Sequence, residues 1–386
     1  MLLKITRPRA VATAVAVAGC LLAGTTPAWA MTDPSPAPTP LLSVDGNRIV
    51  KADGTTLVLN GLNRNGTETL TGTPVTDAEI GWMASDNASS WHARTVRVMV
   101  GSAQWTGMCP NLSNNAAGYK AMIDQEIGSI TRRGMVALLD LHTSTANCTS
   151  VGRHAMPDAA VTKAFWSDAA ARYAPRRLVA FELYNEPHWV TESVWRNGSS
   201  SMQDCDPAQA TTALSTCRAK APVYPAVGMQ ELHDLVAAAA PGHLIVVDGL
   251  DYAATPPSAL LSDPQSETVY GMHPYTCADP NAACATTANA HANLAILQRW
   301  VPLAAQAPVW VTEFGWPANT PHGYVDGSAY YTETIDFLQQ QSPAWGWIAF
   351  SMDGNVAGAF SVISNTGTYY PNSTGSVVYR ALHAAG

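Results

Sequence analysis

The chain has 386 residues, of which 47% are hydrophobic and 13% charged, and its formal net charge at pH 7 is −8. This composition excludes a disordered chain, which needs low hydrophobicity and high charge, and the sequence has neither a coiled-coil heptad pattern nor a collagen Gly-X-Y period. An acidic chain is also a poor partner for nucleic acid or anionic lipid, whose binding needs clustered Lys and Arg.

The N-terminal segment has the features of a secretory signal peptide. A basic start precedes the apolar run Ala10–Gly24, and Ala28-Trp29-Ala30 matches the pattern of a signal peptidase site. The run is too short for a membrane-spanning helix, which needs about 20 residues. We therefore expect residues 1–30 to be removed on export, which leaves 18 basic and 29 acidic residues, a net charge of −11. A lipoprotein box at Val17–Cys20 is the alternative, although its apolar core is very short.

A Pro-, Ser- and Thr-rich segment follows the signal peptide. Met31–Pro40 has this composition, which predicts an extended, poorly ordered lead-in. Residues 41–386 contain no second segment of this kind, so we expect them to form one domain. The turns at Asp45-Gly46 and Asp53-Gly54 predict that Leu41–Thr55 forms a hairpin before the first long strand.

Eight β-rich runs alternate with Ala-rich helical stretches through the domain. The runs are Thr56–Leu62, Arg94–Val100, Met135–His142, Leu178–Tyr184, His243–Asp248, Thr268–Tyr275, Val309–Phe314 and Trp345–Met352. The helical stretches are Asp77–Ala88, Ala116–Arg133, Val161–Tyr173, Ala226–Ala239, Ala288–Leu303, Ser328–Gln340 and Val377–Ala384. Several runs are apolar throughout, which is typical of strands buried on both faces of a parallel sheet. The pattern predicts an α/β fold, a (β/α)8 TIM barrel. An open doubly wound sheet is the alternative, but no G-x-G-x-x-G follows any run.

The cysteines support export. Cys20 leaves with the signal peptide, and six of the seven cysteines remain, an even number that predicts disulfides in a secreted chain. Short spacing favours Cys205–Cys217 and Cys277–Cys284, and elimination leaves Cys109–Cys148, although six cysteines allow 15 pairings. No C-x-x-C pair is present, so the pattern does not indicate a zinc site.

Polar side chains gather at the ends of the predicted strands. In a (β/α)8 barrel the carboxyl ends of the strands and the loops after them carry the reactive groups. The candidates in chain order are Arg97, Asp140, His142, Asn185, Glu186, His188, His273, Tyr275, Glu313 and Asp353. A lone His or Arg at a strand end is usually structural, but so many polar groups on one face indicate a functional site.

Two of these candidates form a pair suited to cleaving a glycosidic bond. Glu186 and Glu313 lie at the ends of the fourth and seventh runs, across the predicted barrel mouth from each other. One carboxyl group must protonate the departing oxygen, and the other must attack the sugar carbon or activate water. Glu182 competes with Glu186, but it lies four residues earlier in the strand, about 13 Å deeper at roughly 3.3 Å per residue. We therefore interpret Glu182 as a charge-compensated core carboxylate.

The segments around this pair resemble a known family. Tyr184-Asn185-Glu186-Pro187 and Val311–Gly315 are similar to the two catalytic signatures of glycoside hydrolase family 5, the cellulase family. Arg97, Asp140-Leu141-His142 and His273-Pro274-Tyr275 match further family positions in the same order. The resemblance covers the chain from about Leu41 to the C-terminus. It implies a (β/α)8 catalytic domain, hydrolysis with retention of configuration, Glu186 as acid/base and Glu313 as nucleophile.

The same resemblance implies roles for the supporting residues. Asn185 would hydrogen-bond the sugar 2-hydroxyl, a contact that strengthens in the transition state. Arg97 and Tyr275 would hold Glu313 ionised and oriented. Two histidines would line the subsite next to the bond that is cut, His142 and His273.

The aromatic residues of the site depart from the family pattern. The family usually has a tryptophan late in the eighth strand as a sugar platform, and our alignment places Phe350 there, with Trp347 three residues earlier. Either Trp347 supplies the platform or the platform differs. Trp189 and Trp316 each follow a candidate glutamate by three residues, and Trp105 follows the second run, so these three are further platform candidates. Ordinary core packing is the alternative for each, since indoles bury much apolar area.

The sequence predicts a secreted, retaining endo-β-glycanase that acts on a neutral β-linked polysaccharide or oligosaccharide, with β-1,4-glucan favoured. A β-mannanase or a β-diglycosidase of the same family is the alternative. We expect a monomer without cofactor or metal, and no membrane contact after removal of the signal peptide.

Two other functional classes fit the sequence less well. A metal-dependent hydrolase could use His142, His273 and Asp353, but neither H-x-H at the first strand nor H-E-x-x-H is present. A non-catalytic carbohydrate-binding barrel is the second, and the presence of both Glu186 and Glu313 argues against it.

Overall fold

A computed structural model of the protein describes residues 42–69, 74–108, 115–144, 154–278, 284–317, 319–320, 323–352, 360–365 and 367–385. Several predictions fall outside these residues. They are the signal peptide at 1–30, the lead-in at 31–40, the Cys109–Cys148 pair and Asp353.

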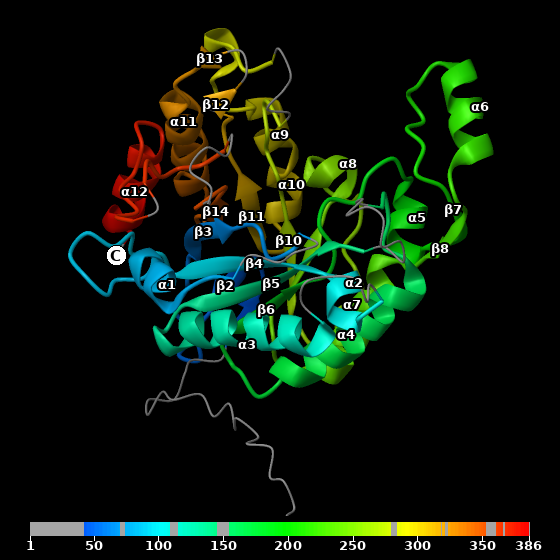
Figure 1. Ribbon diagram of the computed structural model, residues 1–386, viewed down its shortest axis with the longest axis horizontal. Helices are drawn as coiled ribbons and strands as arrows, with labels where there is room; N and C mark the ends of the chain where they lie inside the picture. The colour runs from blue at the N-terminus through cyan, green and yellow to red at the C-terminus, as the bar shows by residue number, and fades with distance from the viewer. Residues whose placement is uncertain are drawn as a thin grey trace, which may run out of the picture. The chain divides into compact units, whose positions relative to one another are not determined.

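Eight parallel strands close into a barrel in the order β10-β11-β14-β3-β4-β5-β6-β9 (Figure 1). Their bounds are β3 Asn60–Arg64, β4 Thr95–Gly101, β5 Val136–Thr143, β6 Val179–Glu182, β9 Ile245–Asp248, β10 Thr268–Gly271, β11 Val309–Phe314 and β14 Gly346–Ala349. Each of the eight predicted runs overlaps one of these strands. The predicted (β/α)8 TIM barrel is therefore confirmed.

Helices surround the barrel, and each predicted helix overlaps at least one of them. The helices are α1 Asp77–Met83, α2 Ser102–Thr106, α3 Ala116–Arg132, α4 Ala159–Tyr173, α5 Glu192–Asn197, α7 Met229–Ala239, α8 Leu250–Ala253, α9 Leu294–Arg299, α10 Val301–Ala304, α11 Ser328–Gln339 and α12 Gly375–Ala384. Helix α1 ends five residues before the predicted end, and the short helices α2, α5 and α8 were not predicted. Asn115 and Asp158 begin α3 and α4 by accepting backbone N–H groups of the first turn. None of the helices in the described part of the chain is long and apolar enough to span a membrane.

The predicted helix Ala288–Leu303 is wrong as a single element. It is divided into the 3-10 turn η1, Thr287–Asn289, and the short helices α9 and α10. Asn293 caps α9 by accepting the N–H of Ile296, so a new helix starts there. Pro302 lies in the first turn of α10, where its missing N–H is tolerated but would break a continuous helix.

The predicted N-terminal hairpin is present and closes the lower end of the barrel. Strands β1, Ser43–Asp45, and β2, Arg48–Val50, pair antiparallel around Gly46, whose φ of 60° suits the tight turn. The first barrel strand begins at Asn60, four residues later than predicted, because Leu57 is hydrogen-bonded to Ile49 of the hairpin instead. The hairpin and the lower barrel share one apolar core, composed of Leu42, Ile49, Leu59, Val136, Leu138, Leu178, Ala180, Leu244, Val246, Val269, Trp310 and Ile348.

Side chains along each strand alternate between the barrel interior and the helices. On β5, Ala137 and Leu139 pack in the core between strands and helices, whereas Leu138 faces the interior. The next two residues of the same parity are Asp140 and His142, and both are buried. The inward face is therefore apolar at the bottom of the barrel and polar at its upper mouth, where the site lies.

One long excursion follows β6 and was not predicted. It contains β7 Ser199–Met202, α6 Thr211–Lys220 and β8 Tyr224–Ala226, and Figure 1 shows α6 projecting away from the barrel beyond α5. Helix α6 has no buried side chain, and a disulfide joins Cys205 to Cys217. The second predicted pair, Cys277 and Cys284, is also bonded, in the segment after β10.

Candidate active site

Arg97 is the charged centre of the barrel mouth. Its side chain extends inward from β4 and is fully buried. The guanidinium group contacts polar side chains from several strands: Glu182 Oε2 at 2.5 Å, Glu313 Oε2 at 2.8 Å, Asn185 Oδ1 at 2.8 Å, Asp140 Oδ2 at 3.0 Å and Asn63 Oδ1 at 3.1 Å. A planar guanidinium with five N–H donors can hold several acceptors in fixed geometry. Arg97 therefore sets the relative positions of the groups around it.

Glu313 is held at both of its carboxyl oxygens. Oε2 accepts from Arg97, and Oε1 accepts from the hydroxyl of Tyr275 at 2.7 Å. Burial and the negative charge of Glu313 raise the pKa of Tyr275 well above its usual value, so the phenol stays a donor. The register of β11 shifts between Val311 and Phe314, and both residues of this irregular stretch reach the site. These two residues are Thr312 and Glu313, and the hydroxyl of Thr312 contacts Nε2 of His273 at 3.0 Å.

Glu186 lies just beyond the end of β6 in a left-handed conformation, with φ of 54°. Such a conformation is uncommon for a residue other than glycine and often marks a functional position. The backbone N–H of Glu186 donates to Asp248 Oδ2 at 3.0 Å, and its carboxyl Oε1 contacts His273 Nδ1 at 3.0 Å. Each of Glu186, His273 and Glu313 has a polar side-chain atom within 4.8 Å of the other two. The two predicted glutamates thus face each other across the barrel mouth.

His273 carries a positive charge at neutral pH. Burial disfavours the imidazolium, but the neighbouring carboxyl groups and the hydrogen bond to Glu186 outweigh burial and raise the pKa of His273 above its usual value. Its Nδ1 and Nε2 atoms are engaged by Glu186 and Thr312. A metal ion needs a neutral imidazole as ligand, so the chemistry of this cluster favours a proton over a metal ion.

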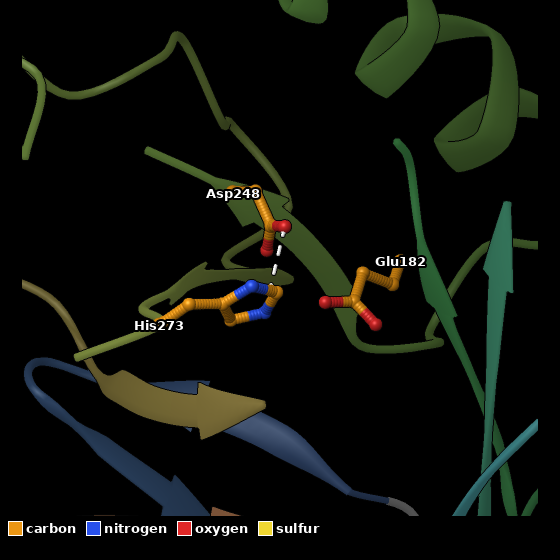
Figure 2. Close-up of side chains that lie close together, drawn as sticks. All are labelled: Glu182, Asp248 and His273. Atoms are coloured by element: carbon orange, nitrogen blue, oxygen red, sulfur yellow. Dashed lines mark ion pairs between the residues drawn. The ribbon is translucent and has the colours of Figure 1, made fainter. Parts of the chain in front are cut away.

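Glu182 lies directly against the site, which corrects the prediction that it is well below it. The guanidinium of Arg97 contacts both Glu182 and Glu313, so a single side chain connects Glu182 to the mouth of the barrel. Figure 2 shows Glu182, Asp248 and His273 pointing toward one another, and each offers an atom within 4.8 Å of the other two. The charge of Glu182 is compensated by Arg97, as expected, and this ion pair outweighs burial and lowers the pKa of Glu182.

Asp248 is a site residue that sequence reasoning missed. It is the last residue of the fifth predicted run, so the strand-end rule that selected the other candidates could have found it. Asp248 is fully buried, and burial together with the charge of Glu182 raises its pKa well above the usual value.

The remaining predicted polar residues also line the mouth. His142 is buried, and its Nδ1 contacts Asp140 Oδ2 at 2.7 Å, which fixes the imidazole ring. Asn185 uses its amide oxygen to accept from Arg97. Its buried amide nitrogen has no hydrogen-bond partner among the described residues, so a donor is available for a ligand.

Three predicted platforms are wrong, because their indole rings are buried in the protein core. Trp316 is 1% exposed and donates from Nε1 to the carbonyl of Val325. Trp347 has no exposed surface and packs against Phe314 with ring centroids 5.9 Å apart. The third candidate, Trp105, is also fully buried. None of these three rings can stack on a sugar.

Other aromatic rings are accessible near the site. Trp189 is half-buried, next to the stacked pair of His188 and Tyr252, whose ring centroids lie 4.2 Å apart at an interplanar angle of 10°. Tyr252 is 43% exposed and comes from α8, where no sequence signal indicated it. Phe350, at the family's platform position, is half-buried and contacts the ring of Phe360.

Comparisons with known proteins agree with this architecture. The family model for cellulase, glycosyl hydrolase family 5, matches residues 50–355. An endoglucanase gh5-1 from Neurospora crassa is 23% identical over 273 residues, which are 66% of this chain and 59% of that protein, so the chain spans less than two thirds of this relative.

Solved structures share the fold at low sequence identity. A β-glucanase from Saccharophagus degradans in complex with cellotetraose superposes with a TM-score of 0.61 at 18% identity, covering 91% of this chain and 95% of that one. The catalytic domain of a mannanase from Streptomyces sp. SirexAA-E gives a TM-score of 0.53 at 18% identity, covering 89% and 91%. The family model spans most of the barrel and includes both glutamate segments. The chain therefore belongs to the cellulase family, glycosyl hydrolase family 5.

Proposed function

We propose that the protein is a retaining endo-β-glycanase in which Glu186 is the acid/base and Glu313 the nucleophile. The observation that carries this proposal is the approach of Glu186 and Glu313, which have carboxyl oxygens within 4.8 Å of each other. Retaining glycosidases separate the two carboxyl groups by about 5–5.5 Å, whereas inverting enzymes leave about 6.5–9.5 Å for a water molecule. The short approach supports retention.

The surroundings of the two glutamates suit these different roles. In the first step a carboxylate oxygen of Glu313 attacks the anomeric carbon, the glycosidic bond breaks, and Glu186 gives its proton to the departing oxygen. Arg97 and Tyr275 both donate to Glu313, and these two contacts orient its carboxyl group. In the second step Glu186 takes a proton from water, whose oxygen attacks the same carbon and releases Glu313.

A sugar in the site would meet two groups that suit its hydroxyls. The amide nitrogen of Asn185 is buried beside Arg97 and would donate to the 2-hydroxyl of the sugar attached to Glu313. His142, oriented by Asp140, would line the same subsite. Both assignments agree with the roles that the family resemblance implies.

We favour β-1,4-glucan as the substrate. The solved β-glucanase that shares the fold is in complex with cellotetraose, and the curated relative is an endoglucanase. A mannanase has the same fold at equal identity, so β-mannan is the second candidate. We also propose that the protein acts outside the cell, since the bonds Cys205–Cys217 and Cys277–Cys284 persist in oxidising compartments.

A panel of polysaccharides tests the proposal. The purified secreted protein is incubated with β-1,4-glucan, mixed-linkage β-glucan, β-1,3-glucan and β-mannan, and new reducing ends and viscosity are measured. We expect the highest rate on β-1,4-glucan, with a fall in viscosity that precedes most of the reducing ends, as internal cleavage requires. Glu313→Gln serves as the inactive control. A higher rate on β-mannan would select the second candidate, and no release from any β-glycan would contradict the proposal.

A further inference from the structure

Asp248 joins the acid/base residue to the buried floor of the site. It is the last residue of β9, which lies between β6 and β10 in the barrel. Its Oδ2 atom accepts the backbone N–H of Glu186 at 3.0 Å and faces His273 Nε2 at 3.7 Å (Figure 2). Gly271 on β10 leaves room for this carboxyl group, because a Cβ atom there would lie 2.1 Å from Asp248 Oδ1.

Asp248 and Glu182 point toward each other, and each offers a carboxyl oxygen within 4.8 Å of the other (Figure 2). Within the described residues, Asp248 Oδ1 and Glu182 Oε1 are both buried and have no hydrogen-bond partner. Two carboxylates this close repel each other, and a hydrogen bond between them needs one proton. Glu182 keeps its charge because Arg97 Nε contacts its other oxygen at 2.5 Å. The shared proton therefore belongs to Asp248.

The charges of the whole mouth lead to the same conclusion. Five buried carboxyl groups are close together, those of Asp140, Glu182, Glu186, Asp248 and Glu313. Their pairing with cations is not one-to-one: Arg97 meets Asp140, Glu182 and Glu313, His273 meets Glu186 and Asp248, and His142 meets Asp140 again. If all five were ionised, the negative charges would outnumber the cations, and a buried excess of charge strongly destabilises a folded protein. Within the described part of the chain, Asp248 is the one of the five whose nearest cation, Nε2 of His273 at 3.7 Å, lies beyond hydrogen-bond distance.

We propose that Asp248 is a positioning residue that remains protonated while the enzyme works and fixes Glu186 through its backbone N–H. This inference rests on the proposed role of Glu186 as acid/base. The contact constrains Glu186 in its left-handed conformation and so aims the carboxyl group toward Glu313. The groups that face Asp248 are Glu182 from β6, His273 after β10 and the Glu186 segment, with Arg97 behind Glu182. A neutral Asp248 leaves the ionisation of Glu186 undisturbed as Glu186 alternates between acid and base.

Two substitutions separate this role from an ionic one. Asp248→Asn has the same shape, is always neutral, accepts the Glu186 N–H and donates to Glu182. We expect kcat/KM within about threefold of the unsubstituted enzyme and unchanged limbs of the pH profile. Asp248→Ala removes the contact, and because small misplacements of reacting groups can cost about 10²-fold in rate, we expect a loss of that order in kcat with little change in KM. Asp251→Asn is the matched control, because Asp251 lies three residues further along the chain, in α8, and is exposed.

Either of two results in the activity measurements would overturn the proposal. If Asp248→Asn lowers kcat as much as Asp248→Ala, or moves a limb of the pH profile by a full unit, then Asp248 works as an anion. If Asp248→Ala keeps full activity, Asp248 does not position Glu186.

A second measurement does not depend on activity. The raised pKa of Asp248 means that its contribution to stability is present at low pH and is lost as pH rises through the folded-state pKa. Asn cannot lose this proton, so the Tm of Asp248→Asn should fall less than that of the unsubstituted protein between pH 5 and pH 9. An equal fall of Tm with pH in the two proteins would overturn the proposal for Asp248, whether or not the protein cleaves a glycan. A smaller fall in Asp248→Asn, found in a protein that cleaves no glycan, would support the proposal for Asp248 and contradict only the proposed function.

Discussion

The hydroxyl of Tyr275 donates to Oε1 of Glu313 over 2.7 Å. Together with Arg97 on the other oxygen, this bond leaves the carboxyl group a single orientation. The bond forms between a neutral donor and a charged acceptor, a class that contributes about 1.5–3 kcal/mol. Arg97 and Tyr275 therefore orient Glu313 together.

Tyr275→Phe should lower kcat by about 10- to 100-fold, the rate equivalent of that hydrogen-bond free energy. Tyr119→Phe is the control, because the Tyr119 hydroxyl is also buried but bonds only to the backbone of Gly101 and Thr67. Steady-state kinetics on a soluble β-glucan, with Tm measured for each variant, checks this prediction. Equal kinetic losses in the two variants would show that the Tyr275 hydroxyl has no special role.

The exposed ring of Tyr252 should contribute to binding of longer substrates. It stacks on His188, two residues after Glu186. Aromatic stacking is worth about 0.5–1.5 kcal/mol, so Tyr252→Ala should raise KM for a long oligosaccharide about 2- to 12-fold and leave kcat nearly unchanged. Tyr370→Ala, which removes another exposed tyrosine, should change neither value. An unchanged KM for Tyr252→Ala would show that sugars do not reach this ring.

Glu126 on α3 should make stability depend on pH. It is 1% exposed, neither of its oxygens has a hydrogen-bond partner among the described residues, and burial raises the pKa of Glu126 to about 8. In the unfolded chain a glutamate titrates at about 4.3, so the folded state binds an extra proton between these values and stability falls as pH rises toward 8. Each pKa unit corresponds to about 1.4 kcal/mol.

The substitution Glu126→Gln removes this titration. Thermal unfolding of both proteins at pH 5, 7 and 9 should show a smaller loss of Tm for the variant than for the unsubstituted protein. A parallel decline in both proteins would mean that Glu126 is already ionised in the folded state.

The strand pattern and the strand-end rule predicted most of the site. Arg97, Glu186, His273 and Glu313 follow from the rule that reactive groups gather at the carboxyl ends of barrel strands. The rule also covers Asp248, but its position in a run of apolar residues concealed it. Glu182 proved to be close to the site because the long side chain of Arg97 reaches both Glu182 and Glu313, a tertiary contact that distance along a strand does not predict.

The tryptophans show what sequence spacing cannot predict. Trp316 follows Glu313 by three residues, yet its ring turns toward α11 and packs against Tyr330. The direction of a side chain in a loop depends on tertiary contacts, which spacing along the chain does not encode. The excursion with β7, α6 and β8 was missed for a different reason. Helix α6 buries none of its side chains, so its sequence has no apolar face that would predict a helix.

The different roles of Glu186 and Glu313 are the central claim, and the stereochemistry of azide products tests it most directly. A β-glycoside with a good leaving group is given to Glu186→Ala and to Glu313→Ala in the presence of azide. Glu186→Ala still forms the sugar–enzyme bond, since such a leaving group needs little acid, and azide attacks that intermediate without a base to give the β-glycosyl azide. In Glu313→Ala no intermediate forms, and azide attacks the substrate directly to give the α-product. Recovery of the α-azide from Glu186→Ala would contradict the assignment of both residues.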